Sequence, residues 1–169
     1  QAQEMRDEST RLNYKKGNFI AALALAQAYD FAGRYDEAIE IYKQALENNP
    51  TANENGLLII HGNLAKLYKK QEKYPQALSE YQKQLDVLTK VSKGLPLSDT
   101  FKTIFLEIET SFCKIYMITK DQEKLIQHLK KAEEYYSDNV YLGAYINYHS
   151  LWGFYYKLTK EWDKCFREL

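Results

Sequence analysis

Residues 22–50 read ALALAQAYDFAGRYDEAIEIYKQALENNP, and residues 64–81 read LAKLYKKQEKYPQALSEY. The two segments carry the same alanines, leucines and tyrosines with the same internal spacing. The shared positions are Leu25, Ala26, Tyr29, Tyr35, Ala38 and Tyr42 in the first segment and Leu64, Ala65, Tyr68, Tyr74, Ala77 and Tyr81 in the second. Small and aromatic residues at fixed offsets, on two helical stretches separated by a turn, are typical of a helical-hairpin repeat.

Two further copies of the pattern follow. If Ala38 is taken as the small residue early in the second helix of a unit, its equivalents are Ala77, Leu125 and Cys165. Each unit also carries a small residue followed three positions later by tyrosine: Ala26 and Tyr29, Ala65 and Tyr68, Cys113 and Tyr116, Gly153 and Tyr156. These positions fall on one helix face, which favours four repeats over unrelated amphipathic helices.

The pattern resembles the tetratricopeptide repeat (TPR), a pair of antiparallel helices with a period of about 34 residues. The units of this chain are longer than that period. This resemblance, of the stretched-repeat type found in bacterial TPR signalling proteins, implies an all-α fold, a right-handed superhelix (α-solenoid) of antiparallel helix pairs. We expect residues 1–169 to form a single array. Its parts are an N-terminal helix or partial repeat at 1–18 and repeats at 19–50, 55–93, 99–137 and 140–169, the last of them truncated.

Nine helices are predicted, at about 3–16, 19–32, 35–48, 55–71, 74–93, 99–119, 122–137, 140–159 and 162–169. Thr51 to Glu54 has the form of a capping box before the fourth helix. Gly94-Leu-Pro96 breaks the chain, after which Ser98 or Asp99 should cap the next helix. Because Trp162 and Phe166 still need to be buried, we expect the natural protein to continue beyond Leu169.

The composition excludes several classes of function. The 23 basic residues balance 23 acidic residues, so the chain has no general attraction for nucleic acid or anionic membranes. No apolar run approaches the roughly 18 residues of a membrane span. The two cysteines, Cys113 and Cys165, occupy small-residue packing positions and are expected to be buried, inert thiols rather than a redox pair.

No catalytic, cofactor-binding or metal-binding motif stands out. Phosphate-binding loops, nucleophile elbows and zinc-protease signatures are all missing from the sequence. His61, His128 and His149 lie in different repeats without ligand spacing, so we expect no metal and no cofactor. The segment is therefore predicted not to be an enzyme, although a parent protein could carry a kinase domain.

The resemblance also implies where a partner would bind, since the first helix of each TPR unit lines the concave side of the array. The residues transferred by repeat position include Leu23, Asp30 and Phe31 in unit one, Glu107, Ser111 and Met117 in unit three, and Asn147 and Ser150 in unit four. The predicted partner-binding residues are Gln27, Asn63, Lys66, Lys69, Lys70, Lys114, Phe154 and Lys157. The TPR subclass that clamps a peptide carboxylate is not matched, because Leu23, Gln27, Glu107 and Ser111 replace four of its five polar groups.

The lysines of the predicted partner-binding surface and a stripe of tyrosines each have two interpretations. The lysines favour an acidic peptide or acidic helix as partner, but Lys69 and Lys70 also suit the last turn of their helix, where cations complement the macrodipole. Tyr141, Tyr145 and Tyr148 form a stripe that either packs against the Tyr135–Tyr136 helix or forms a groove wall or homodimer contact.

Three functions remain open. The first is a non-catalytic protein- or peptide-binding module within a larger bacterial protein. The second is a sensory region, either of a sensor histidine kinase or TPR–helix-turn-helix regulator, or of a cytoplasmic peptide-pheromone receptor. The third, an enzyme on a superhelical scaffold, has no support in the residues. The compartment is undetermined: the sensor region of a kinase would be periplasmic, and a protein of any other kind would be cytoplasmic.

Overall fold

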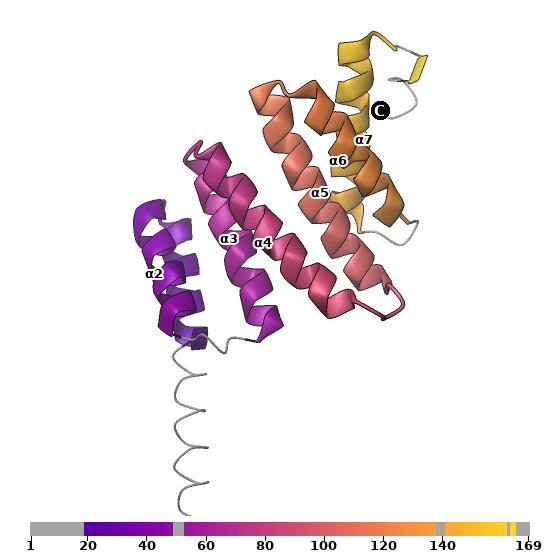
Figure 1. Ribbon diagram of the computed structural model, residues 1–169. Coiled ribbons are helices and arrows are strands. Elements are labelled where there is room, and N and C mark those ends of the chain that lie inside the picture. The colour runs from indigo at the N-terminus through magenta and orange to yellow at the C-terminus, as the bar shows by residue number, and fades with distance from the viewer. Residues whose placement is uncertain (1–18, 49–52, 138–140, 162, 165–169) are drawn as a thin grey trace, which may run out of the picture. The chain divides into compact units, whose positions relative to one another are not determined.

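The computed structural model describes residues 19–48, 53–137, 141–161 and 163–164, and every regular element within them is helical (Figure 1). A helix occupies residues 19–31, followed by α2 (Tyr35–Asn48), α3 (Glu54–Lys70), α4 (Tyr74–Ser92), α5 (Asp99–Thr119), α6 (Gln122–Tyr135) and α7 (Leu142–Thr159). The all-α prediction is confirmed. Seven of the nine predicted helices fall in the described residues; the helix at 3–16 lies outside them, as does most of the one at 162–169.

The helix boundaries follow local capping chemistry. Ser98 caps α5, its Oγ accepting a hydrogen bond from the Phe101 amide at 3.4 Å, as the sequence predicted. The capping box predicted for Thr51 to Glu54 is wrong. Asn53 is the cap of α3, because its Oδ1 accepts from the Gly56 amide at 2.9 Å, and Glu54 is the first residue of the helix.

The turns inside the hairpins establish the repeat. Gly33, Glu72, Lys120 and Lys160 all adopt the left-handed conformation, with φ between 58° and 74°. Each precedes its repeat's reference position (Ala38, Ala77, Leu125 and Cys165) by the same offset, including the weak third unit. The spacing that the sequence alignment predicted therefore recurs in the backbone. A residue other than glycine costs about 1 kcal/mol in this conformation, so three of the four turns carry strain.

The chain forms two compact units, unit 1 (residues 1–77) and unit 2 (residues 78–169), with α4 beginning in the first and continuing in the second. In unit 1, Ala26 and Ala38 are fully buried in one cluster, as predicted for the crossing of the helix at 19–31 with α2. Ala65 and Ala77 are also fully buried. The core cluster of this unit consists of Ala26, Ala38, Ile39, Tyr42, Ala45, Ile60, Leu64 and Leu67.

In unit 2, α5, α6 and α7 pack against one another (Figure 1). Their core cluster consists of Leu106, Cys113, Leu125, Leu129, Ala132, Ala144, Tyr148, Leu151 and Trp152. The Cys113 thiol is buried and donates to the Leu125 carbonyl at 3.8 Å; burial raises its pKa, which keeps the thiol protonated and unreactive. The prediction of a buried thiol is confirmed for Cys113, while Cys165 lies outside the described residues.

A glutamate–histidine pair is also buried in unit 2. The Glu109 carboxylate on α5 is 2% exposed, and its Oε2 lies 2.6 Å from Nδ1 of His128 on α6. The His128 ring stacks on Phe112, with 4.5 Å between ring centroids. Buried carboxylates need a partner, so this contact ties α5 to α6.

Candidate functional site

Two of the predicted groove residues of unit 2, one on α5 and one on α7, are in contact. Lys114 on α5 donates from Nζ to Oδ1 of Asn147 on α7 at 2.7 Å. Lys114 is half-buried, and this burial lowers the pKa of its ammonium group. Two residues chosen from separate repeats by position alone are therefore in direct contact. We call the surface of α5 and α7 around the Lys114–Asn147 contact the α5–α7 face.

One end of the α5–α7 face is polar. Tyr141, just before α7, donates from its hydroxyl to the Glu107 carboxylate on α5, and this hydrogen bond raises the pKa of Tyr141 to about 12. Ser111, one turn further along α5, donates from Oγ to the Glu107 carbonyl at 2.7 Å. The hydroxyl of Ser111 is thus satisfied within its own helix.

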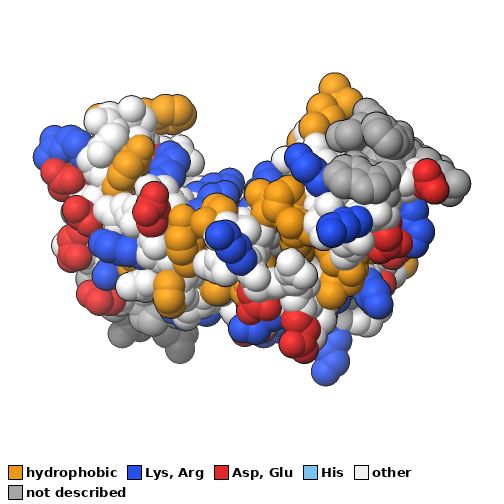
Figure 2. Space-filling view, turned by 90° about the horizontal axis from the view of Figure 1, so that it is seen from above, with side chains coloured by type: hydrophobic (Ala, Val, Ile, Leu, Met, Phe, Trp, Pro, Cys, Tyr) orange, Lys and Arg blue, Asp and Glu red, His pale blue; other side chains and the backbone are white. Residues whose placement is uncertain are grey.

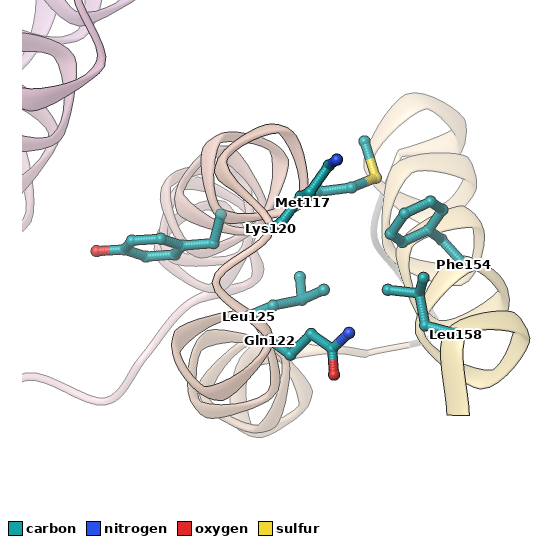
Figure 3. A pocket seen from close by; sticks show the side chains of 7 residues that line it. Met117, Lys120, Gln122, Leu125, Phe154 and Leu158 are labelled. Carbon is teal, nitrogen blue, oxygen red and sulfur yellow. The ribbon is translucent and has the colours of Figure 1, made fainter.

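The other end contains an apolar pocket of about 190 Å³. Side chains from the end of α5, the start of α6 and the end of α7 converge on it (Figure 3). Its lining consists of Tyr116, Met117, Lys120, Gln122, Leu125, Phe154 and Leu158. Met117 and Phe154 were among the groove residues inferred from the sequence, whereas Lys120, Gln122 and Leu158 were not.

A sequence signal for Lys120 existed. It occupies the turn position that Gly33 holds in the first repeat, and lysine there is unexpected because glycine tolerates the left-handed conformation best. Gln122 and Leu158 carried no comparable signal. Their contribution to the pocket depends on how the ends of three helices meet, which repeat alignment does not specify.

In unit 1, predicted groove residues of the helix at 19–31 and of α3 are also in contact. Lys70 Nζ lies 2.5 Å from Oδ1 of Asp30, and Asn63 donates to the buried Tyr42 hydroxyl at 2.9 Å. The charge of Lys70 is thus compensated by another residue of the predicted groove. Gln27 and Lys66 are exposed.

The basic character of the predicted surface is weaker than the sequence suggested. Lys70 and Lys114 are engaged with Asp30 and Asn147, and Lys69 is half-buried. Lys66 and Lys157 are exposed. Figure 2 shows lysine and arginine side chains lying among hydrophobic ones on the face that it presents.

The tyrosine stripe packs largely within unit 2. Tyr136 stacks on Tyr148 with 4.7 Å between ring centroids and lies 6.3 Å from Tyr145. His149 joins them, its Nε2 being 3.2 Å from the Tyr136 hydroxyl. Packing against the end of α6 therefore accounts for Tyr145 and Tyr148, although Tyr145 remains 45% exposed.

Metal binding and membrane insertion find no support in the described part of the chain. No group of three or more histidine, cysteine, aspartate or glutamate side chains there could hold a metal ion. None of its helices has both the length and the apolar character that crossing a bilayer requires.

Residues 21–54 and 60–93 match the family model of the tetratricopeptide repeat. Each of these two segments is a tetratricopeptide repeat. The second matched segment follows the first at the same offset as Ala77 follows Ala38, so the family model and the alignment of the sequence with itself agree. Arrays of TPR units present extended concave surfaces and generally mediate contacts between proteins.

A solved structure extends the likeness over most of the chain. The crystal structure of BtubC (BKLC) from P. vanneervenii matches with a TM-score of 0.71 at 19% sequence identity. The match covers 89% of this chain but only 60% of that one. At this identity the likeness concerns the fold alone. No curated protein sequence matches the chain.

Proposed function

We propose that the chain is a non-catalytic module of a larger bacterial protein, and that it binds a peptide or protein segment on the α5–α7 face. The observation that carries this proposal is the Lys114–Asn147 hydrogen bond, which joins groove positions of two successive repeats into one surface. The polar Glu107–Tyr141 contact lies near the start of α7, and the apolar pocket lies at the ends of α5 and α7 beside the start of α6, so an extended segment would meet polar and apolar groups along its length.

The proposed partner is net acidic. Lys157 on α7 is exposed, and its repeat position predicts that it lies on the α5–α7 face. An acidic partner would gain from this cation without the cost of desolvating a buried charge. Binding should weaken with added salt, because exposed charges are screened over about 8 Å at physiological ionic strength.

The test begins with selection of binders from a random peptide library, followed by NMR mapping on the isotope-labelled protein. Binding on the α5–α7 face should shift the amide signals of Asn147 and Ser150. The Lys157→Glu variant should weaken an acidic binder roughly two- to fivefold. Lys93→Glu, an exposed change outside the face, serves as the matched control. Signals that shift only on the outer surfaces of α4 and α6 would contradict the proposal, as would failure to select any binder.

The candidate parent proteins remain the sensor histidine kinase or TPR–helix-turn-helix regulator and the cytoplasmic pheromone receptor. Each would use the same surface for a different signal. The gene sequence on both sides of the segment decides among them. An upstream signal peptide with a downstream membrane span and output domain would identify a periplasmic sensor, and a start codon with a helix-turn-helix domain would identify the receptor.

A further inference from the structure

The pocket at the end of the α5–α7 face differs from the rest of that face in being hollowed and almost entirely apolar. We propose that it holds one large apolar side chain of an acidic partner segment, whose carboxylates pair with Lys120 and Lys160. We call it the anchor pocket. This inference rests on the proposed function and specifies the partner for which the pocket is suited.

The size of the anchor pocket favours a single side chain. Sites for drug-sized ligands and cofactors usually enclose about 300–1,000 Å³, and this pocket encloses about 190 Å³. Met117, Phe154 and Leu158 contribute flexible and aromatic surface from two helices (Figure 3). A leucine or phenylalanine inserted among them would be desolvated on several sides, which is the environment in which anchor residues dominate binding.

The charge of the anchor pocket favours an acidic segment. Lys120 is the one charged residue among its lining side chains. The neighbouring Asp121 does not neutralise Lys120, because Asp121 caps α6: it accepts from the Lys124 amide at 3.1 Å and pairs with the Lys124 ammonium group. Lys160 stands at the corresponding turn after α7, so two exposed cations follow the ends of two packed helices.

The two lysines follow the backbone plan of the repeat. Both lysines adopt the left-handed conformation at positions where glycine would be unstrained, with φ of 60° and 61°. Glu72 holds the same conformation at the corresponding turn of the second repeat, so this backbone strain belongs to the repeat and does not by itself mark a site. Neither lysine forms a hydrogen bond or ion pair through its side chain within the described residues. Both ammonium groups can therefore pair with an incoming carboxylate.

The first experiment blocks the anchor pocket. Gln122 is exposed at its rim, and Gln122→Trp should fill the opening without touching the core. The matched control is Gln127→Trp, an exposed glutamine on the same helix that does not line the pocket. The probe is a synthetic peptide with a central phenylalanine flanked by glutamates, measured by fluorescence anisotropy. We expect Gln122→Trp to weaken binding at least about tenfold, and Gln127→Trp to leave it unchanged.

The second experiment tests the charges without disturbing the turns. A Lys120→Gly/Lys160→Gly variant removes both ammonium groups but suits the left-handed backbone, so it should fold at least as stably. It should bind the glutamate peptide roughly three- to tenfold more weakly, yet bind a peptide with glutamine in place of glutamate as the unchanged protein does. Replacing the central phenylalanine with alanine should weaken binding to both proteins.

The outcomes separate this inference from the proposed function. A selected peptide that maps to Asn147 and Ser150 but is insensitive to Gln122→Trp and to the glycine variant would overturn the anchor pocket and leave the proposed function standing. Absence of any binder on the α5–α7 face would overturn both. Two results would assign the pocket to another occupant and also overturn the inference. One is self-association that Gln122→Trp abolishes, and the other is a nuclear Overhauser contact from the Met117 methyl to residues 162–169 in the free protein.

Discussion

Both cores consist mainly of small and aliphatic side chains, but the core of unit 1 contains one aromatic residue, Tyr42, whereas the core of unit 2 contains Tyr148 and Trp152 and lies beside a buried glutamate–histidine pair. The family model matches residues 21–54 and 60–93 and does not match residues 94–169. Even so, the left-handed turns keep their repeat spacing in both units. The same backbone arrangement therefore accommodates a second large aromatic side chain and a buried polar contact in unit 2.

The largest effect is expected from the buried pair of unit 2. His128→Ala would leave the Glu109 carboxylate buried without its partner and remove the ring stacked on Phe112. Leaving a buried polar group without its hydrogen-bond partner costs about 1–3 kcal/mol, and losing the packing of the stacked ring adds to this cost. Urea denaturation, followed by circular dichroism, should show this loss in the free energy of unfolding.

Two variants sharpen this prediction. His149→Ala, which removes a half-buried ring bonded to Tyr136, should cost only about 1 kcal/mol. The double variant Glu109→Leu/His128→Leu should recover most of the loss, because apolar residues often replace a buried ion pair without destabilisation. If the double variant were as unstable as His128→Ala, the buried charge would not be the cause.

In unit 1, the close crossing of helices should be most sensitive to added volume. Ala65 on α3 is fully buried, so Ala65→Leu would overpack its surroundings and cost about 1–3 kcal/mol. Ala28→Leu, at an exposed position of the helix at 19–31, should change the free energy of unfolding by less than about 0.5 kcal/mol. Thermal melts of the two variants give the comparison, and equal melting temperatures would refute the assignment of Ala65 to a helix crossing.

The sequence predicted the helices of both units for a physical reason. Small residues at crossings and tyrosines beside them recur at fixed offsets, so the helix at 99–119 and the burial of Cys113 could be expected from alignment alone. The contacts between particular side chains could not be expected from the alignment. The Glu109–His128 contact joins residues that no repeat position relates to each other, and the anchor pocket depends on where three helices end. Repetition predicts the packing of backbones, whereas these features arise where the repeats differ.

A smaller effect is expected at the turns. Lys120→Gly in unit 2 and Glu72→Gly in unit 1 should each stabilise the protein by up to about 1 kcal/mol, because both residues hold the left-handed conformation. The gain is reduced by the greater freedom of glycine in the unfolded chain. The reverse change, Gly33→Ala, should destabilise by about 1 kcal/mol. Chemical denaturation of the three variants tests this, and a stabilising Gly33→Ala would show that the turn conformation is misassigned.

A still smaller effect is expected from the ion pair that joins the helix at 19–31 to α3 in unit 1. Lys70 and Asp30 are both partly exposed, so their contact should contribute about 0.2–1 kcal/mol. Asp30→Asn should remove this contribution at low salt and make little difference at high salt, where the charges are screened. Urea denaturation at two salt concentrations gives the measurement. A loss of equal size at both concentrations would mean that the side chain of Asp30 acts through packing and not through its charge.

The smallest effect is expected at the polar end of the α5–α7 face, and it should depend on pH. The Tyr141 hydroxyl donates to the Glu107 carboxylate, which raises the pKa of Tyr141 to about 12 from an ordinary value near 10. Because the pKa is raised in the folded state, the stabilisation is complete below about pH 10 and is lost as the pH rises toward 12. Since Tyr141 is 53% exposed, solvent screening limits this contribution to a few tenths of a kcal/mol.

Tyr141→Phe should therefore lower stability slightly at pH 8, and this loss should shrink as the pH rises through 12, where the hydroxyl of the unchanged protein ionises and no longer donates. Spectrophotometric titration of tyrosinate, compared between the unchanged protein and this variant, should show one residue fewer ionising near pH 12. The comparison isolates Tyr141, because the substitution leaves every other tyrosine in place. A difference that appears near pH 10 would mean that the hydroxyl of Tyr141 does not donate to Glu107 in solution.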